Sequence, residues 1–253
     1  MFLTCYIKVV KPILSGYLFI CYSRKNQLKM CNPVKSTAPR LTQHERSEAM
    51  RERLIEATLE CLVNDGYTGT TISKIISTAK VSRGAPIHHF PSKAALMEAT
   101  AEQLIKKIYI SLGKIIKKME NSEDRLESLI MAGASLLKTP EASALLELLV
   151  ASRHEPELAA KLQHLWIISY KTTRDAAEHY LASKSDIDNV GDLIILTQWV
   201  LRGMVEDMHI TSHTAKTTEF FNRYIKLWSS LLSHHLYTKS DVTTPPPKPK
   251  YWD

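Results

Sequence analysis

The chain has 253 residues, of which 44% are hydrophobic, and a formal net charge of +7. This composition provides enough apolar side chains for a folded core. The excess charge lies at one end, because residues 1–39 hold six Lys or Arg and no acid, which leaves 27 basic and 26 acidic residues elsewhere. Eight glycines and long stretches of helical apolar periodicity exclude a turn-rich sandwich or barrel, so we predict an all-α protein.

Residues 1–40 are expected to be a disordered or wrongly assigned extension without function. Residues 13–22, ILSGYLFICY, resemble the apolar part of a signal peptide, but no small-residue cleavage site follows and ten residues are too few to span a bilayer as a helix. Our preferred interpretation is that translation starts at Met30. A flexible extension and a membrane anchor are the alternatives.

The first strong helix signal begins at residue 42. The segment TQHE has capping-box spacing, and apolar residues then recur on one helical face as far as Val63. We expect this helix to run to about Asp65 and to end at Gly66. Cys61 on its apolar face is interpreted as a reduced core thiol, and Cys5, Cys21 and Cys31 as reduced thiols, since none has metal-ligand spacing.

Two short helices are predicted next, joined by a tight turn at Lys80 and Val81. Thr70 or Thr71 can cap the second helix. Ser82 is the expected N-cap of a third helix that carries Arg83, Gly84 and Ala85 in its first turn and Pro86 at its fourth position. Ser92 is expected to cap a long fourth helix that starts at Lys93. A short second and third helix joined in this way form a helix-turn-helix unit.

This segment is also cationic. Residues 66–97 contain no Asp or Glu, and they carry six basic or titratable side chains, namely Lys74, Lys80, Arg83, His88, His89 and Lys93. Because DNA binding depends on local potential rather than on net charge alone, we expect the third helix to face double-stranded DNA.

Residues 51–96 resemble the DNA-binding domain of tetracycline-repressor-like (TetR) transcriptional regulators. The agreeing features are Gly66-Tyr67, Thr70-Thr71, Val81-Ser82, Gly84-Ala85, His89-Phe90 and Ser92-Lys93. The resemblance implies that Arg83, Gly84 and Ala85 meet bases or nearby backbone, and that Thr71, His88 and Lys93 lie at phosphates. Two positions depart from the family pattern: Ile87 replaces a common Tyr, and Pro86 a common buried Leu.

Four parts of the chain are predicted: residues 1–40 as the extension, 41–93 as the DNA-binding domain, 94–238 as a helical ligand-binding and dimerisation domain, and 239–253 as a disordered, Pro-rich tail. The fourth helix is expected to continue over 96–119, and further helices are expected at 125–137, 141–153, 156–181, 188–209 and 216–237. A cavity for a small apolar or aromatic effector is expected among large side chains, namely Leu148, Trp166, Tyr170, Trp199, Met204 and Met208.

The last predicted helix carries an aromatic stripe, which in a TetR-like protein favours a homodimer interface. Its members are Phe220, Phe221, Tyr224, Leu227, Trp228 and Leu231. Two recognition helices related by a two-fold axis would read an inverted repeat. We therefore expect a cytoplasmic repressor that a small molecule releases from DNA, with no cofactor and no membrane association.

Two other functions are weighed against this one. An all-α enzyme is less favoured, because no phosphate loop or nucleophile elbow is present, and His209 and His213 lack the remainder of a zinc motif. A helical partner-binding protein without DNA affinity is the other alternative. The sequence does not reveal the operator or the effector.

Overall fold

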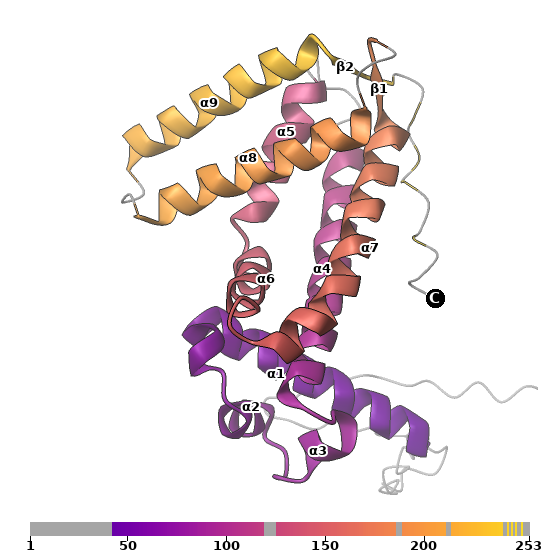
Figure 1. The fold of residues 1–253 in the computed structure, drawn as a ribbon, viewed down its shortest axis with the longest axis vertical. Coiled ribbons are helices and arrows are strands. Elements are labelled where there is room, and N and C mark those ends of the chain that lie inside the picture. The colour runs from indigo at the N-terminus through magenta and orange to yellow at the C-terminus, as the bar shows by residue number, and fades with distance from the viewer. Residues whose placement is uncertain are drawn as a thin grey trace, which may run out of the picture. The chain divides into compact units, whose positions relative to one another are not determined.

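The computed structural model describes residues 42–118, 125–185, 189–210 and 214–239, together with residues 242, 244, 246 and 249. These residues are overwhelmingly helical, which confirms the all-α prediction (Figure 1). The elements are α1 Gln43–Gly69, α2 Ile72–Ala79, α3 Ala85–His89, α4 Lys93–Lys118, α5 Arg125–Leu137, α6 Pro140–Ala151, α7 Pro156–Tyr180, β1 Leu181–Ser183, α8 Val190–Ile210, α9 Ala215–Ser233 and β2 Leu236–Thr238.

The chain divides into two compact units, residues 1–46 and residues 47–253. The described part of the first unit contains the predicted capping box. Thr42 Oγ1 accepts a hydrogen bond from the Glu45 amide at 3.1 Å, and Glu45 accepts one from the Thr42 amide at 2.6 Å. The backbone hydrogen bond from Thr42 lowers the pKa of the Glu45 carboxyl. Residues 1–40, including Met30, lie outside the described residues.

Helix α1 bends where the sequence predicts that it ends. Gly66 adopts φ 65° and ψ −177°, a conformation that glycine accepts without a Cβ clash. Tyr67 to Gly69 then continue as a last helical turn, so the helix extends beyond Asp65. Cys61 is a buried free thiol, as predicted, and its sulfur lies 3.5 Å from Thr78 Oγ1.

A first apolar core joins α1, α2 and the start of α4 to α6 and α7. Leu54 and Leu62 on α1, Ile75 on α2, and Leu96 on α4 are fully buried in it. Leu148 of α6 belongs to the same cluster. The cluster therefore crosses the predicted domain boundary between residues 93 and 94.

A second core lies where α5, α8 and α9 meet the far part of α4 (Figure 1). Ile130, Val205 and Ile225 are among its buried members. Helix α4 therefore passes from the first core into the second, because Leu104 belongs to one and Ile116 to the other.

A short two-stranded antiparallel sheet, absent from the predictions, joins the segment after α7 to the segment after α9. Strand β1 pairs with β2 in the register Leu181↔Thr238 and Ser183↔Leu236. Two further backbone hydrogen bonds flank the pair, Lys184 N to His235 O at 2.8 Å and Lys239 N to Tyr180 O at 2.9 Å. Residues 181 and 236–237, predicted as helix ends, are strand residues instead. Three-residue strands contain too few residues for an alternating pattern to be visible in the sequence.

The predicted disordered tail, residues 239–253, is described only in part. Lys239 is tied to the fold, since Arg125 Nη1 donates to its carbonyl oxygen at 3.0 Å and its own Nζ donates to Glu178 O at 2.6 Å. Val242 packs against the second core. The tail prediction is thus wrong for Lys239 and Val242, and most of the other residues in this range lie outside the described part.

Candidate DNA-contact surface and effector cavity

The helix-turn-helix begins with a capped second helix. Thr71 is the N-cap of α2, and its hydroxyl accepts a hydrogen bond from the Lys74 amide at 3.2 Å. Lys80 ends the helix in the left-handed conformation, with φ 53° and ψ 49°, and its amide donates to Ile76 and Ser77 carbonyls. This confirms Thr71 as a cap and Lys80 as the turn.

Helix α3 starts two residues later than predicted. Its N-cap is Gly84 rather than Ser82, so Ala85 and Pro86 are the first two helical residues and Arg83 lies in the turn before them. The physical reason is Pro86. At the fourth helical position its missing N–H would cost the first intrahelical hydrogen bond, whereas at the second position no such bond is required.

The predicted DNA residues of this segment differ in exposure. Arg83 and His88 are exposed and Gly84 is half-buried, whereas Ala85 is buried and its methyl group is directed toward the protein. Pro86 is also buried, which places it where the family pattern has a buried Leu. Ile87 is 76% exposed, the highest value among the large exposed apolar side chains of the described residues.

Not all cations of the segment remain free of other contacts. Lys74 Nζ lies 2.5 Å from Asp65 Oδ1, an acid just outside the acid-free stretch. Lys93 packs over the ring of Tyr67, with Nζ 4.2 Å from the ring centroid, and burial lowers its pKa against the opposing effect of Glu155. Lys93 at the start of α4 is therefore partly occupied within the protein.

The predicted cap of α4 is confirmed, and it contacts the second half of the chain. Ser92 Oγ accepts a hydrogen bond from the Ala95 amide at 3.2 Å and donates to Glu157 Oε1 at 2.5 Å. A second bridge joins Lys161 Nζ to Glu98 Oε2 at 3.0 Å. The start of α4 is thus fixed to α7.

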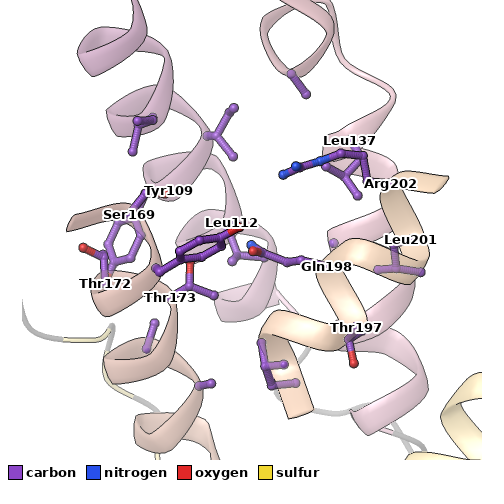
Figure 2. Close-up of a pocket in the computed structure, with 18 of the residues that line it drawn as sticks. Tyr109, Leu112, Leu137, Ser169, Thr172, Thr173, Thr197, Gln198, Leu201 and Arg202 are labelled. Carbon is purple, nitrogen blue, oxygen red and sulfur yellow. The ribbon is translucent and has the colours of Figure 1, made fainter. Parts of the chain in front are cut away.

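A cavity of about 220 Å³ lies among five helices of the second half (Figure 2). Helices α4, α5, α6, α7 and α8 all contribute to its wall. The lining is mainly aliphatic and aromatic, and its polar side chains include Tyr109, Ser169, Thr172, Thr173, Thr197, Gln198 and Arg202. This is the usual composition of a small-molecule site, in which a few polar groups set the orientation.

Two of the six predicted effector residues line this cavity. Trp166 and Tyr170 are part of its wall. The other four lie elsewhere: Leu148 is 0% exposed in the first core, Trp199 is 54% exposed, and Met204 and Met208 belong to the second core. These four side chains lie on other faces of α6 and α8. The size of a side chain alone therefore does not predict that it lines the cavity.

Helix α8 contributes five cavity-lining residues, and their helical spacing was visible in the sequence although they were not among the predicted effector residues. Ile194, Thr197, Gln198, Leu201 and Arg202 follow helical i, i+3, i+4 spacing, and all line the cavity. Figure 2 shows Gln198 and Arg202 extending from α8 toward the cavity. Three of these residues are polar, which is why a search for large apolar side chains passed over them.

Aromatic contacts organise the polar side of the cavity. The rings of Trp166 and Tyr170 meet edge to face with centroids 5.6 Å apart, and the Arg202 guanidinium lies 5.4 Å from the Trp166 ring centroid. Trp199 Nε1 donates a hydrogen bond to the Tyr170 hydroxyl at 3.1 Å. Burial lowers the pKa of Arg202, and the proximity of Tyr170 and Glu206 acts in the opposite direction.

The predicted stripe on the last helix divides into two faces. Phe221, at 4% exposure, is buried, and Trp228 is half-buried and donates through Nε1 to Thr197 Oγ1 at 3.1 Å. The exposed face consists of Phe220, Tyr224, Leu227 and Leu231, with Leu227 at 56%. Trp199 and Leu196 are exposed on the neighbouring α8.

Two further features bear on the alternatives. Within the described ranges, no group of three or more His, Cys, Asp or Glu side chains could hold a metal ion. The side chains of His209 and His213 lie outside those ranges. No helix in the described part of the chain is long and apolar enough to cross a membrane.

Residues 54–100, from α1 to the first turns of α4, match the family model described as bacterial regulatory proteins, tetR family. The HTH-type transcriptional regulator CymR of Pseudomonas putida is 29% identical over 185 residues, which cover 73% of this chain and 89% of CymR. The HTH-type transcriptional regulator BetI of Paraburkholderia phymatum is 30% identical over 121 residues, which cover 47% of this chain and 61% of BetI.

The fold has matches among solved structures. A crystal structure of a transcriptional regulator from Rhodococcus sp. Rha1 aligns with a TM-score of 0.58 at 19% sequence identity. The alignment covers 73% of this chain and 97% of that one. At this level of identity the match shows a shared fold.

Proposed function

This chain belongs to the tetR family of bacterial regulatory proteins, and we propose that it represses transcription from an inverted-repeat operator until a small molecule fills the cavity. The family identifies the chain as a ligand-responsive, DNA-binding transcriptional regulator. The repressive direction, the symmetry of the operator, a cytoplasmic location and the absence of catalysis are parts of the proposal.

The observation that carries the proposal is the shared use of helix α4. Its first part, including Leu96, packs in the core that holds the helix-turn-helix, while Leu112 and Ile116 further along line the cavity. A ligand that occupies the cavity must press on the helix that positions the DNA-binding unit. The two sites can therefore bias one conformational equilibrium, which is the requirement for allostery.

Helix α6 supplies a second connection between the two sites. Glu147 Oε2 accepts a hydrogen bond from the Tyr67 amide at 3.1 Å, next to the bend of α1 at Gly66. Its neighbours Leu146 and Leu149 line the cavity. A change in cavity shape that moves α6 would therefore also move an anchor of the DNA-binding unit.

For the DNA contacts, we propose that exposed Arg83 reads a base edge and that Thr71 and His88 meet phosphates. Gly84 supports a close backbone approach, since it has no side chain. Lys93 is proposed as a phosphate contact that must first leave the Tyr67 ring. Ala85 is not proposed as a base contact, because it is buried.

We propose a homodimer that uses the exposed face of α9, defined by Phe220, Tyr224, Leu227 and Leu231. Leu227→Glu should convert the dimer to a monomer, since it adds a charge to this apolar face, and operator affinity should fall with it. Sedimentation velocity measures the first effect and a mobility shift the second. Lys226→Glu is the matched control, because this exposed position lies away from the apolar face. A Leu227→Glu protein that sediments as a dimer would show that another surface forms the interface.

The main experiment is selection of bound sequences from random DNA by the purified full-length protein. We expect an inverted repeat whose half-sites are separated by about one helical turn or a multiple of it. Recovery of no enriched sequence, or affinity that is independent of salt, would contradict DNA recognition.

Arg83→Ala tests the proposed base contact on the selected site. Loss of a bidentate contact to a base should cost about 1 to 3 kcal/mol and relax the preference at one position of the half-site. Exposed Arg153 supplies the control, Arg153→Ala. An unchanged sequence preference in the Arg83 variant would remove Arg83 from the readout.

The effector is proposed to be mainly apolar or aromatic, as the cavity wall is. Coupling of about 1 to 3 kcal/mol would change operator affinity by roughly 5- to 150-fold. By the same linkage, operator DNA must weaken effector binding by an equal factor.

A further inference from the structure

The cavity wall is apolar except at a small group of side chains, and it carries a positive charge with no negative charge among the described wall residues to match it. Arg202 is the one charged side chain among the described residues that line the cavity. None of the described residues that line the cavity carries a carboxylate. An interior arginine normally has an acidic partner, because a desolvated cation without one is costly.

Arg202 has no such partner within the described part of the chain. Glu206, one turn further along α8, acts to raise the pKa of Arg202, which burial lowers, but forms no ion pair with it. The contact that Arg202 does make is with the Trp166 ring. Stacking on an aromatic ring uses the face of the guanidinium and leaves its in-plane N–H donors for another acceptor.

A second donor is available beside Arg202. The Tyr170 hydroxyl accepts its hydrogen bond from Trp199 Nε1, which leaves the phenolic hydrogen to be donated. Trp166 contacts both Tyr170 and Arg202, and the proximity of Tyr170 acts to raise the pKa of the Arg202 guanidinium, so the two residues are neighbours on the cavity wall. One cation and one hydroxyl suit a singly charged carboxylate, which accepts two or more hydrogen bonds.

The size of the cavity limits the rest of the ligand. An apolar cavity of about 150 Å³ holds benzene, so about 220 Å³ suits an apolar body with a small polar head. Such a molecule has about ten non-hydrogen atoms. A phosphate dianion would require more positive charge than this wall offers.

We propose that the effector is an aromatic or medium-chain aliphatic carboxylic acid, whose carboxylate pairs with Arg202 while its apolar body fills the cavity. This inference rests on the proposed function, in that the cavity is taken as the effector site. Beyond the proposed function, it specifies that the effector carries a negative charge and belongs to the carboxylic acids. The empty protein carries a cation that the effector neutralises.

Binding of matched acid and amide probes to the full-length protein tests the inference. The pairs are 3-phenylpropanoate with 3-phenylpropanamide, and octanoate with octanamide, measured by isothermal titration calorimetry at pH 7. For at least one pair we expect the acid to bind 10-fold or more tightly than its amide. If in neither pair the acid binds 10-fold more tightly than its amide, or if all four probes fail to bind up to their solubility limits, the proposal is overturned.

Arg202→Met then assigns the preference to this side chain. The variant should bind acid and amide within about 3-fold of each other and leave amide affinity within about 3-fold of the unaltered protein. Arg153→Met, at an exposed position, should keep the full preference. If Arg202→Met still prefers the acid, the carboxylate binds elsewhere.

Stability without ligand gives a readout that does not depend on the choice of probe. Because Arg202 is partly desolvated and has no acidic partner, Arg202→Met should leave the melting temperature unchanged or raise it. A marked fall would show that Arg202 has a structural role, which overturns the inference. Selection of an operator from random DNA tests the regulator function separately, so failure of the acid probes with a successful selection rejects the ligand class alone.

Discussion

The first apolar core and the region around the cavity differ in how completely side chains fill them. The first, around α1, α2 and the start of α4, contains most of the large side chains that are fully buried, including Leu54, Leu62, Ile75 and Leu96. The second half of the molecule encloses a cavity of about 220 Å³. Close packing makes the first region resist deformation, whereas a cavity leaves wall atoms without contacts and free to accept a ligand.

Because of this difference, the first core is expected to be rigid and the cavity region deformable. If Arg83 reads bases, as proposed, it must keep a fixed position relative to α3, which the dense first core favours. An effector site must change when a ligand enters, which the cavity favours. Helices α4 and α6 take part in both regions, so a change in one reaches the other.

The largest expected effect comes from truncation in the dense core. Leu148→Ala should lower the free energy of unfolding by about 2 to 5 kcal/mol, because Leu148 is 0% exposed and its neighbours cannot collapse into the space. Leu146→Ala, two residues away on α6, removes a side chain that lines the cavity and already lacks part of its contacts, so it should cost clearly less. Urea unfolding at one protein concentration measures both. Equal costs would mean that the two regions do not differ in packing.

An intermediate effect is expected at the contact between the regions. Glu147→Ala should weaken the anchoring of Tyr67 by about 0.5 to 1.5 kcal/mol, the usual net value of a hydrogen bond. In this variant, hydrogen exchange of the Tyr67 amide should be several-fold faster than in the unaltered protein. Added effector should also change that exchange rate less than it does in the unaltered protein. Glu56→Ala, an exposed position on α1, is the control and should leave that amide unchanged. No change at Tyr67 in Glu147→Ala would show that the anchor does not hold in solution.

The smallest effect is expected at the cavity wall. Gly133 lies within α5, and a Cβ added there would meet Leu201 Cδ1 at 3.7 Å, an ordinary contact. Gly133→Ala should therefore raise the free energy of unfolding by about 0.5 to 1 kcal/mol through helix propensity. Gly113→Ala on α4, with nothing within 4 Å of the added Cβ, calibrates the propensity term. If Gly133→Ala destabilises while Gly113→Ala stabilises, the wall at Gly133 is packed more tightly than the cavity implies.

Local features were predictable from sequence because each is determined within about one helical turn. The capping box at Thr42, the caps at Thr71 and Ser92 and the bend at Gly66 all depend on residues at most four positions apart. The start of α3 was the local error. The cap preference of Ser82 was weighed above the position of Pro86, and the structure favours the latter.

The faces of the helices were harder to predict. Helix α9 has two apolar faces, and sequence cannot tell which of them packs inward, because Phe220 and Phe221 are chemically the same. The predicted dimer interface therefore contained residues of both faces. Phe221 is buried and Trp228 donates a hydrogen bond to Thr197 of α8, whereas Leu227 lies on the exposed face.

The sequence by itself determined the all-α class, the resemblance to the tetR family and the cationic segment at residues 66–97, because helix periodicity, caps and motif spacing are properties of neighbouring residues. Only the tertiary structure decided which side chains enclose the cavity, since that depends on how faces of five separate helices converge. Arg202 shows the difference: in the sequence it is one arginine among many, and in the fold it is the one charged side chain among the described residues that line a mainly apolar cavity.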